Sequence, residues 1–143
     1  MPAPEFRLLS TDQTEVGLPD LRGRVVLVTF WATWCGPCKQ ELPAIDSVYR
    51  RLRSSGFAVV GVDYREQGAD VSSFAQRSGL SFPLLQDSTG EVAFRYRLPG
   101  VPASYLVDRD GLLRQIHVGP LSAKELTRMV DALLSAPATT GTP

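Results

Sequence analysis

Two apolar runs in the first half of the chain have the length and composition of buried β-strands. They are Arg24–Trp31 and Phe57–Tyr64, which are rich in Val and aromatic residues. Between them, apolar side chains recur at spacings of three and four, which predicts an amphipathic helix that ends near Gly56. A strand, a helix and a strand within about 40 residues make a βαβ unit, so the two strands are expected to be parallel. The apolar stripe of the helix consists of Leu42, Ile45, Tyr49 and Leu52.

The second half of the chain contains shorter elements. Helical patterns cover Val71–Ser78 and Glu91–Tyr96, with a short strand expected near Phe82–Leu85. Ala103–Val107 and Leu112–Val118 are strand-like runs joined by a turn rich in Asp and Gly, which predicts an antiparallel hairpin. Parallel strands in the first half and an antiparallel pair in the second predict a mixed sheet.

The two ends of the chain differ in character. Residues 5–23 are expected to form a hairpin-like extension that starts with a short strand at Glu5–Leu9. Ser122–Ser135 is an amphipathic pattern that opens with the spacing of a capping box, so it predicts a helix. Residues 136–143 are small, polar and proline-containing, and we expect them to be disordered. A single domain over residues 1–135 is therefore expected.

The only two cysteines, Cys35 and Cys38, stand where the first strand gives way to the helix. Pro37 fits the first turn of a helix, where its missing N–H costs nothing. Cys35 is therefore expected at the helix N-terminus, exposed and beside unpaired backbone N–H groups, which favour a thiolate over a thiol. Cys38 lies one turn further on and can close a disulfide with Cys35. A strand, a CxxC pair, a helix and a second strand are the setting of a thioredoxin-like redox motif.

Two other uses of the cysteine pair are less well supported. A zinc site needs four ligands, and the only histidine, His117, has no second CxxC to accompany it. A purely structural disulfide closing so short a ring would constrain the unfolded chain little. Redox chemistry by Cys35 and Cys38 is therefore the favoured interpretation.

The composition excludes several classes of function. The chain of 143 residues carries 15 basic and 15 acidic side chains and is 43% hydrophobic, so no net positive field attracts nucleic acid or an anionic membrane. No apolar run reaches the roughly 18 residues of a membrane-spanning helix. The first residues, Met1–Pro4, lack the charged and apolar regions of a signal peptide. We expect a soluble, monomeric globular domain.

Two stretches carry a resemblance to a known family. Residues 31–43 read WATWCGPCKQELP, and residues 100–111 read GVPASYLVDRDG. They resemble the thioredoxin superfamily, and within it the TlpA/ResA-like branch of thiol–disulfide oxidoreductases, over residues 5–134. The resemblance implies an α/β thioredoxin fold, in which a central mixed β-sheet is flanked by helices. It also implies an N-terminal β extension and an αβ insertion before a cis-proline strand.

The resemblance also implies the chemistry and the partners. A redox-active disulfide takes the place of any cofactor or metal, the substrate is a disulfide-containing protein, and the electrons come from an upstream dithiol protein. Gly36 and Pro37 form the dipeptide of the reducing thioredoxins, whose potential is about −270 mV, so reduction of partner disulfides is the expected direction. The branch is usually exported or membrane-anchored, which favours an extracytoplasmic or periplasmic location, with the cytoplasm as the alternative. Reduction of haem-site cysteines in cytochrome c maturation is the pathway that the resemblance implies.

The resemblance also points to further site residues. Val101 and Pro102 fall where the superfamily has a cis-proline opposite the CxxC, with a backbone that can pair with an extended substrate. Glu41 lies one helical turn after Cys38. It is either an ordinary exposed glutamate or a partly buried acid that exchanges a proton with Cys38, and the CxxCxxExP pattern of the branch favours the acid. Thr29 stands where thioredoxin has a buried aspartate, which leaves Glu41 as the candidate carboxylate.

The two tryptophans that flank the motif are expected to differ. Trp31 is expected in the core, as large aromatic side chains usually are. Trp34, Gly36 and Pro37 are expected to line the surface that meets the substrate. His117 is expected to have neither a catalytic nor a metal-binding role.

Two rival functions can be distinguished by features of the sequence. A thiol peroxidase of the peroxiredoxin kind would have a threonine three residues before its reactive cysteine, where this chain has Ala32. A non-catalytic peptide-binding module would use the groove of Trp34, Val101 and Pro102, but it would have no need of an intact CxxC.

Overall fold

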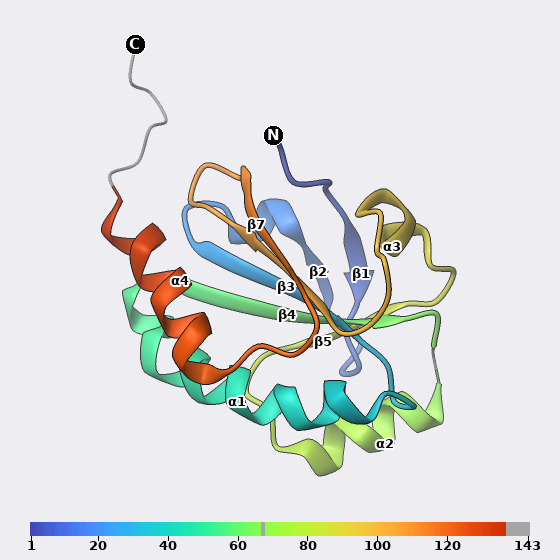
Figure 1. Cartoon of the computed structure of the whole chain (residues 1–143). Coiled ribbons are helices and arrows are strands. Elements are labelled where there is room, and N and C mark those ends of the chain that lie inside the picture. Colours follow the sequence, from blue (N-terminus) through green and yellow to red (C-terminus); the bar gives the residue numbers. More distant parts are fainter. Residues whose placement is uncertain (67, 137–143) are drawn as a thin grey trace.

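A five-stranded mixed sheet in the order β5-β4-β3-β6-β7 runs through the centre of the molecule (Figure 1). The computed structural model describes residues 1–66 and 68–136. Strands β3, β4 and β5 are parallel to one another, and β6 and β7 are antiparallel to their neighbours, which confirms the predicted mixed sheet. The strands are β3 (Val25–Trp31), β4 (Phe57–Tyr64), β5 (Leu84–Asp87), β6 (Ala103–Val107) and β7 (Leu113–Val118).

Helices cover both faces of this sheet (Figure 1). On β3, Leu27 and Trp31 face one hydrophobic cluster with α1, α2 and α4, whereas Val28 and Phe30 face a second cluster with α3 and the N-terminal segment. This alternation follows from the period of two along a strand. Because β3 is buried on both faces, it reads as an unbroken apolar run. The helices are α1 (Gly36–Leu52), α2 (Ala69–Ser78), α3 (Glu91–Arg95) and α4 (Ala123–Ser135).

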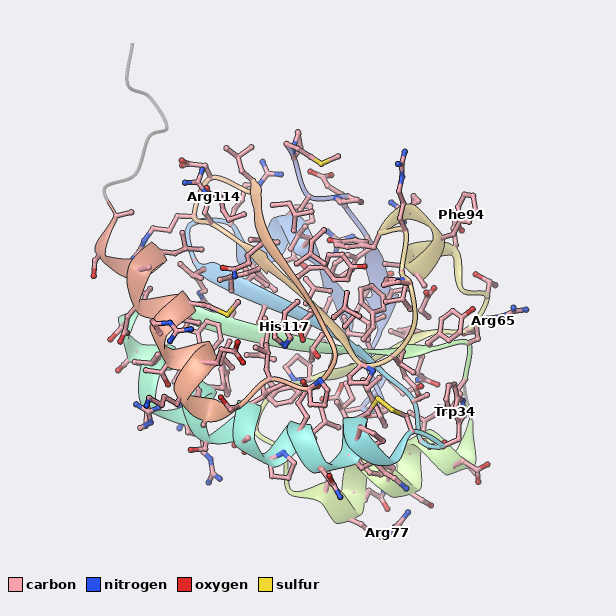
Figure 2. All side chains as sticks on the ribbon, viewed as in Figure 1. Trp34, Arg65, Arg77, Phe94, Arg114 and His117 are labelled. Carbon is pink, nitrogen blue, oxygen red and sulfur yellow. A yellow bond between two sulfur atoms is a disulfide. The ribbon has the colours of Figure 1, made fainter. Side chains whose placement is uncertain are left out.

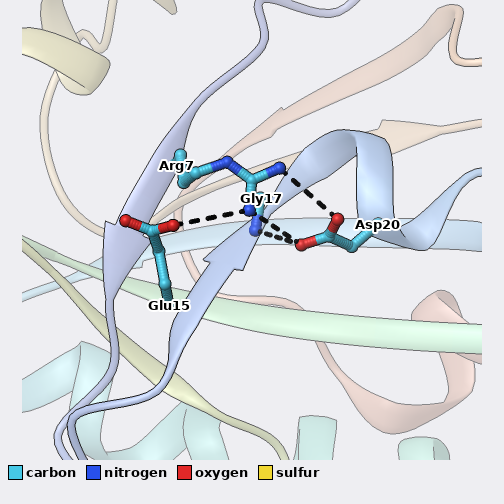
Figure 3. A network of polar contacts seen from close by, with 4 residues as sticks. All are labelled: Arg7, Glu15, Gly17 and Asp20. Carbon is cyan, nitrogen blue, oxygen red and sulfur yellow. Dashed lines mark hydrogen bonds and ion pairs between the residues drawn. The ribbon is translucent and has the colours of Figure 1, made fainter.

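The predicted N-terminal extension is an antiparallel hairpin of β1 (Arg7–Leu9) and β2 (Glu15–Gly17). The Arg7 guanidinium contacts both the Asp20 and the Glu15 carboxylates, and Asp20 also accepts the Gly17 N–H (Figure 3). The hairpin continues to the β5 edge, where the Thr11 N–H donates to the Leu84 carbonyl. The extension therefore covers the face of the sheet opposite α1.

The long helix α1 places the cysteine pair at the C-terminal end of β3. Its buried stripe includes Leu42 and Ile45, as predicted. The helix tightens into a 3-10 turn at Arg53–Ser55, and Gly56 then takes the left-handed conformation with φ 102° that ends it. Pro43 lies inside the helix, so the main-chain hydrogen bond from position 43 to the carbonyl of residue 39 is missing.

One predicted strand needs correction, one predicted helix cap is confirmed in part, and most of the predicted tail lies outside the described residues. The strand expected near Phe82–Leu85 runs instead over Leu84–Asp87, because Pro83 has no N–H to donate to a neighbouring strand. At the start of α4 the Ser122 hydroxyl accepts the Glu125 N–H at 3.1 Å, which is one half of the expected capping box. Of the tail expected to be disordered, residues 136–143, all but Ala136 lie outside the described residues.

Candidate active site

Cys35 and Cys38 form a disulfide at the N-terminus of α1, with Cα atoms 5.3 Å apart. Cys35 is the N-cap residue, and its sulfur accepts the backbone N–H of Cys38 at 3.2 Å. Pro37 occupies the first turn of the helix, as predicted. The sulfur of Cys35 therefore lies at the positive end of a helix of 17 residues, where a negative charge is stabilised.

The surface around the disulfide is formed by Trp34, Gly36 and Pro37, which are exposed. The Trp34 side chain projects from the start of α1 with 65% of its surface accessible (Figure 2). The prediction that Cys35 is exposed is wrong for this disulfide form, since the residue is only 5% accessible. The reason is that Cys35 joins the hydrophobic cluster that also contains Cys38 and Trp31. Trp31 is fully buried, as predicted.

The peptide bond between Val101 and Pro102 is cis, as expected from the superfamily resemblance. Pro102 is buried, and its carbonyl accepts the Gly119 N–H at 2.9 Å. Val101 is half-buried and packs against the hydrophobic cluster that contains both cysteines. The structure thus brings this loop, 66 residues away from Cys35 in sequence, to the same cluster as the disulfide.

Glu41 is buried, with 3% of its surface accessible, so it is not an ordinary surface glutamate. One carboxylate oxygen accepts the Leu121 N–H at 2.6 Å, and the other has no partner among the described residues. Burial raises the pKa of Glu41 to about 7, against the opposing effects of the Leu121 hydrogen bond and of His117. Because Glu41 follows Cys38 by one helical turn, a carboxyl group that titrates near neutral pH lies on the side of the second cysteine.

His117 has a closer relation to the site than the sequence indicated. It is half-buried on β7 between the exposed Ile116 and Val118, as the strand alternation predicts. Its Nε2 lies 3.0 Å from the Pro120 carbonyl, and its charge favours the ionised form of Glu41. The sequence signal that could have found it is the single histidine on the strand just before the loop that binds Glu41.

Thr29 occupies the place of the thioredoxin aspartate and is satisfied by another side chain. Its hydroxyl lies 2.9 Å from the Ser104 hydroxyl on β6, and both residues are buried. The pair replaces a titratable group by a neutral hydrogen bond between neighbouring strands. Thr29 therefore offers no proton acceptor at neutral pH.

Sequence reasoning missed two acidic residues near the motif, Asp63 and Glu66. Asp63 is the penultimate residue of β4 and has no accessible surface. Glu66 follows in the next loop and accepts hydrogen bonds from both the backbone N–H and the hydroxyl of Thr33, two residues before Cys35. An aspartate that ends an apolar run of strand length was the available signal.

Metal binding and membrane insertion were two further possibilities for the described residues. Within residues 1–66 and 68–136 no group of three or more His, Cys, Asp or Glu side chains is arranged to hold a metal ion. No helix in the described part of the chain is long and apolar enough to cross a membrane. The expectation that the protein needs no cofactor stays a prediction.

Several known proteins are similar to this chain in sequence or in fold. The chain is 32% identical over 131 residues to a thiol-disulfide oxidoreductase ResA from Geobacillus kaustophilus, covering 92% of this chain and 75% of that protein. It is 35% identical over 132 residues to the thioredoxin-like protein YneN from Bacillus subtilis, covering 90% and 76%. Among solved structures, a putative thiol:disulfide interchange protein DsbE from Chlorobium tepidum superposes with a TM-score of 0.87 at 33% identity, covering 94% and 96%.

A thioredoxin-fold sheet, a CxxC disulfide at a helix start and these relatives define the protein as a thiol–disulfide oxidoreductase that acts on protein disulfides. A family model also matches most of the chain. The AhpC/TSA family matches residues 1–116, and the chain belongs to that family.

Proposed function

We propose that the protein reduces disulfide bonds of partner proteins, with Cys35 as the nucleophile and Cys38 as the resolving thiol. The observation that carries this proposal is the position of the Cys35 sulfur at the N-terminus of α1, where it accepts the Cys38 N–H. Such a position favours a thiolate, which is the species that attacks a disulfide. The Gly36-Pro37 dipeptide supports the reducing direction, since thioredoxin has a potential of about −270 mV.

The proposed reaction has two exchange steps. The Cys35 thiolate attacks one sulfur of the partner disulfide, forms a mixed disulfide and expels the other partner sulfur as a thiolate. Cys38 then loses its proton and attacks Cys35, which forms the Cys35–Cys38 disulfide and releases the first partner sulfur. Two electrons pass from the cysteine pair to the partner, whose thiolates take up two protons. A separate dithiol protein must then reduce the Cys35–Cys38 disulfide.

Glu41 is proposed to accept the proton of Cys38 in the second step. A general base works best when its pKa lies near the working pH, and burial raises the pKa of Glu41 to about 7. One of its oxygens is already occupied by the Leu121 N–H. The other oxygen has no hydrogen-bond partner among the described residues, so it can take the proton.

The partner is proposed to bind across Trp34 and the Val101–Pro102 loop. Trp34 supplies an exposed apolar surface next to Cys35, with Gly36 and Pro37 completing it. The backbone at Val101 can pair with an extended segment of the partner, as an added strand pairs with a sheet edge. We propose that the protein acts as a monomer, and without nucleic acid, metal or organic cofactor.

An extracytoplasmic location is the compartment that fits this role. A secreted Mycobacterium tuberculosis disulfide oxidoreductase, homologous to Escherichia coli DsbE, superposes with a TM-score of 0.80 at 27% identity, covering 90% of this chain and 96% of that one. Disulfide substrates persist in such compartments. Reduction of haem-site cysteines in cytochrome c maturation is the narrower hypothesis.

The rival functions receive less support. The position of the peroxiredoxin threonine holds Ala32, which is buried. A pure binding module would not need the buried Glu41 beside a redox-capable pair. Replacement of Cys35 by alanine separates the two classes, because a binding module would keep its effect on the partner and a reductase would lose it.

The test is the reduction potential of the Cys35–Cys38 pair. The full chain is equilibrated in defined thiol–disulfide buffers and followed by the fluorescence of Trp31 and Trp34, with Cys35→Ser as the control that shows no transition. A potential of about −250 mV or lower is expected for a reductase. A potential above roughly −180 mV would assign the protein to oxidation or isomerisation instead.

A further inference from the structure

Asp63 is an acidic side chain buried in the central sheet. Its residue has no accessible surface, and neither of its carboxyl oxygens receives an N–H or O–H from any described residue. It lies on β4 directly opposite Trp31 on β3 and Gln86 on β5. The Trp31 indole N–H is itself without a partner in the described chain, and the Gln86 amide contacts Ser10 and Gly68. No neighbour on either strand therefore stabilises a negative charge on Asp63.

The group that Asp63 does contact is another carboxyl, the side chain of Glu66. Two carboxyl groups form a hydrogen bond only when one of them carries a proton. Burial, followed by the hydrogen bond and the negative charge of Glu66, raises the pKa of Asp63 to about 9. Partial burial opposes ionisation of Glu66, but hydrogen bonds from Asp63 and Thr33 outweigh it and lower the pKa of Glu66. The proton therefore resides on Asp63 at neutral pH.

Glu66 connects this buried acid to the cysteine motif. Its Oε1 accepts the Thr33 N–H at 2.8 Å, and its Oε2 accepts the Thr33 hydroxyl at 2.7 Å. The turn that follows is closed by the Cys35 N–H, which donates to the Ala32 carbonyl at 3.1 Å. One chain of contacts thus runs from the sheet through Glu66 to the loop that presents Cys35.

We propose that Asp63 is a positioning residue for the cysteine pair, which in its neutral form donates a hydrogen bond to Glu66 and so holds the Thr33 loop in place. Loss of its proton puts two negative carboxylates in contact, breaks that hydrogen bond and adds a negative charge near Cys35. A nearby negative charge disfavours a thiolate. This inference rests on the thiol chemistry of the proposed function. Within residues 1–66 and 68–136, Glu66 is the charged group that acts on Asp63.

The experiment measures the reactivity of the Cys35 thiol itself. The full chain with Cys38→Ser is alkylated by iodoacetamide between pH 5 and pH 10.5, and the rate is followed by mass spectrometry. The expected profile rises as the thiolate forms and shows a second change in rate near pH 9, where Asp63 loses its proton. Because alkylation requires no partner protein, the result is independent of whether the protein is a reductase.

Three substitutions in this background test the role of Asp63. Asp63→Asn keeps a donor toward Glu66 but cannot ionise, so it should retain the neutral-pH rate within about twofold and lose the alkaline transition. Asp63→Leu removes the donor and should change the rate by about fivefold, the equivalent of one lost hydrogen bond. Glu66→Gln removes the adjacent negative charge, so the alkaline transition should move to lower pH. Asp70→Asn, an exposed aspartate on α2, is the control and should reproduce the parent profile.

Specific outcomes would overturn the proposal. An alkaline transition that persists in Asp63→Asn would show that another group titrates there. A transition that does not move in Glu66→Gln would disconnect the two carboxyl groups. Circular dichroism checks the fold of Asp63→Leu, and if that variant does not fold, the Asp63→Asn and Glu66→Gln profiles still decide the matter.

Discussion

The Glu41 carboxylate accepts the backbone N–H of Leu121 at 2.6 Å, although the two residues are 80 positions apart. This contact joins the second turn of α1 to the loop before α4. It orients one oxygen of Glu41, and the other has no hydrogen-bond partner in the described part of the chain. A buried carboxyl group with one free oxygen, on the side of Cys38, is the arrangement on which the first two predictions rest.

Replacement of Glu41 by glutamine should slow the resolution of the mixed disulfide by about 10²-fold, because a positioned base typically contributes at least that much. The first exchange step, which uses Cys35 alone, should be nearly unchanged. In a single turnover with a disulfide peptide, the mixed disulfide should then accumulate and be trapped by acid for mass spectrometry. Glu125→Gln on α4 is the matched control. Equal rates of resolution in Glu41→Gln and wild type would exclude Glu41 as the base.

The raised pKa of Glu41 also predicts how stability depends on pH. The folded protein keeps this proton up to about pH 7, whereas a free glutamate loses it near 4.5. The stabilisation by Glu41 is therefore complete below pH 4.5 and is lost as the pH rises through 7. The shift corresponds to roughly 3 kcal/mol. Urea unfolding of the oxidised protein at pH 4 and pH 8 should show a smaller loss of unfolding free energy in Glu41→Gln than in wild type, and an unchanged loss would contradict the assignment.

His117 should set where Glu41 titrates. Its positive charge lowers the pKa of Glu41, so His117→Gln should move the pH profile of mixed-disulfide resolution to higher pH. Arg114→Gln removes a charge from the same strand at an exposed position and serves as the control. If the two variants have superimposable profiles, His117 has no specific influence on Glu41.

Trp34 should contribute to partner binding and not to the redox chemistry. Its side chain is 65% accessible beside Cys35, so Trp34→Ala should raise KM for a protein disulfide substrate while the reduction potential changes little. Truncation of an exposed aromatic anchor typically costs about 1–2 kcal/mol of binding, or roughly tenfold in KM. Phe94→Ala, which removes an 82% accessible aromatic side chain on α3, is the control. A similar KM in both variants would remove Trp34 from the binding surface.

Most of the fold could be predicted from the sequence because its strongest signals are local. Strand β4 and strand β6 have the predicted bounds, since each is a continuous apolar run that ends at turn residues. Strand β5 was displaced by two residues because Pro83 interrupts its pattern. The cis bond before Pro102 could not come from composition, and it was found through the resemblance to a superfamily.

Site residues that belong to one segment were predicted, and those that depend on contacts between distant segments were missed. Cys35, Cys38 and Glu41 belong to one stretch, so their spacing on a helix could be worked out in advance. The burial of Glu41 depends on the distant Leu121. The sequence alone therefore did not decide between an exposed glutamate and a buried acid at this position. Asp63 looks like the polar end of a strand, and its contact with Glu66 depends on how the following loop folds back.

Pro43 divides α1 into an N-terminal part that carries the disulfide and a longer part that packs against the sheet. The missing main-chain hydrogen bond from position 43 lies between the turn that carries the disulfide and the stripe that anchors the helix to the sheet. The cysteine-bearing turn is therefore tied to the rest of the helix by fewer main-chain bonds than an unbroken helix would provide. Opening and closing of the disulfide can then be accommodated within that turn, while Ile45 and the residues beyond it keep their packing.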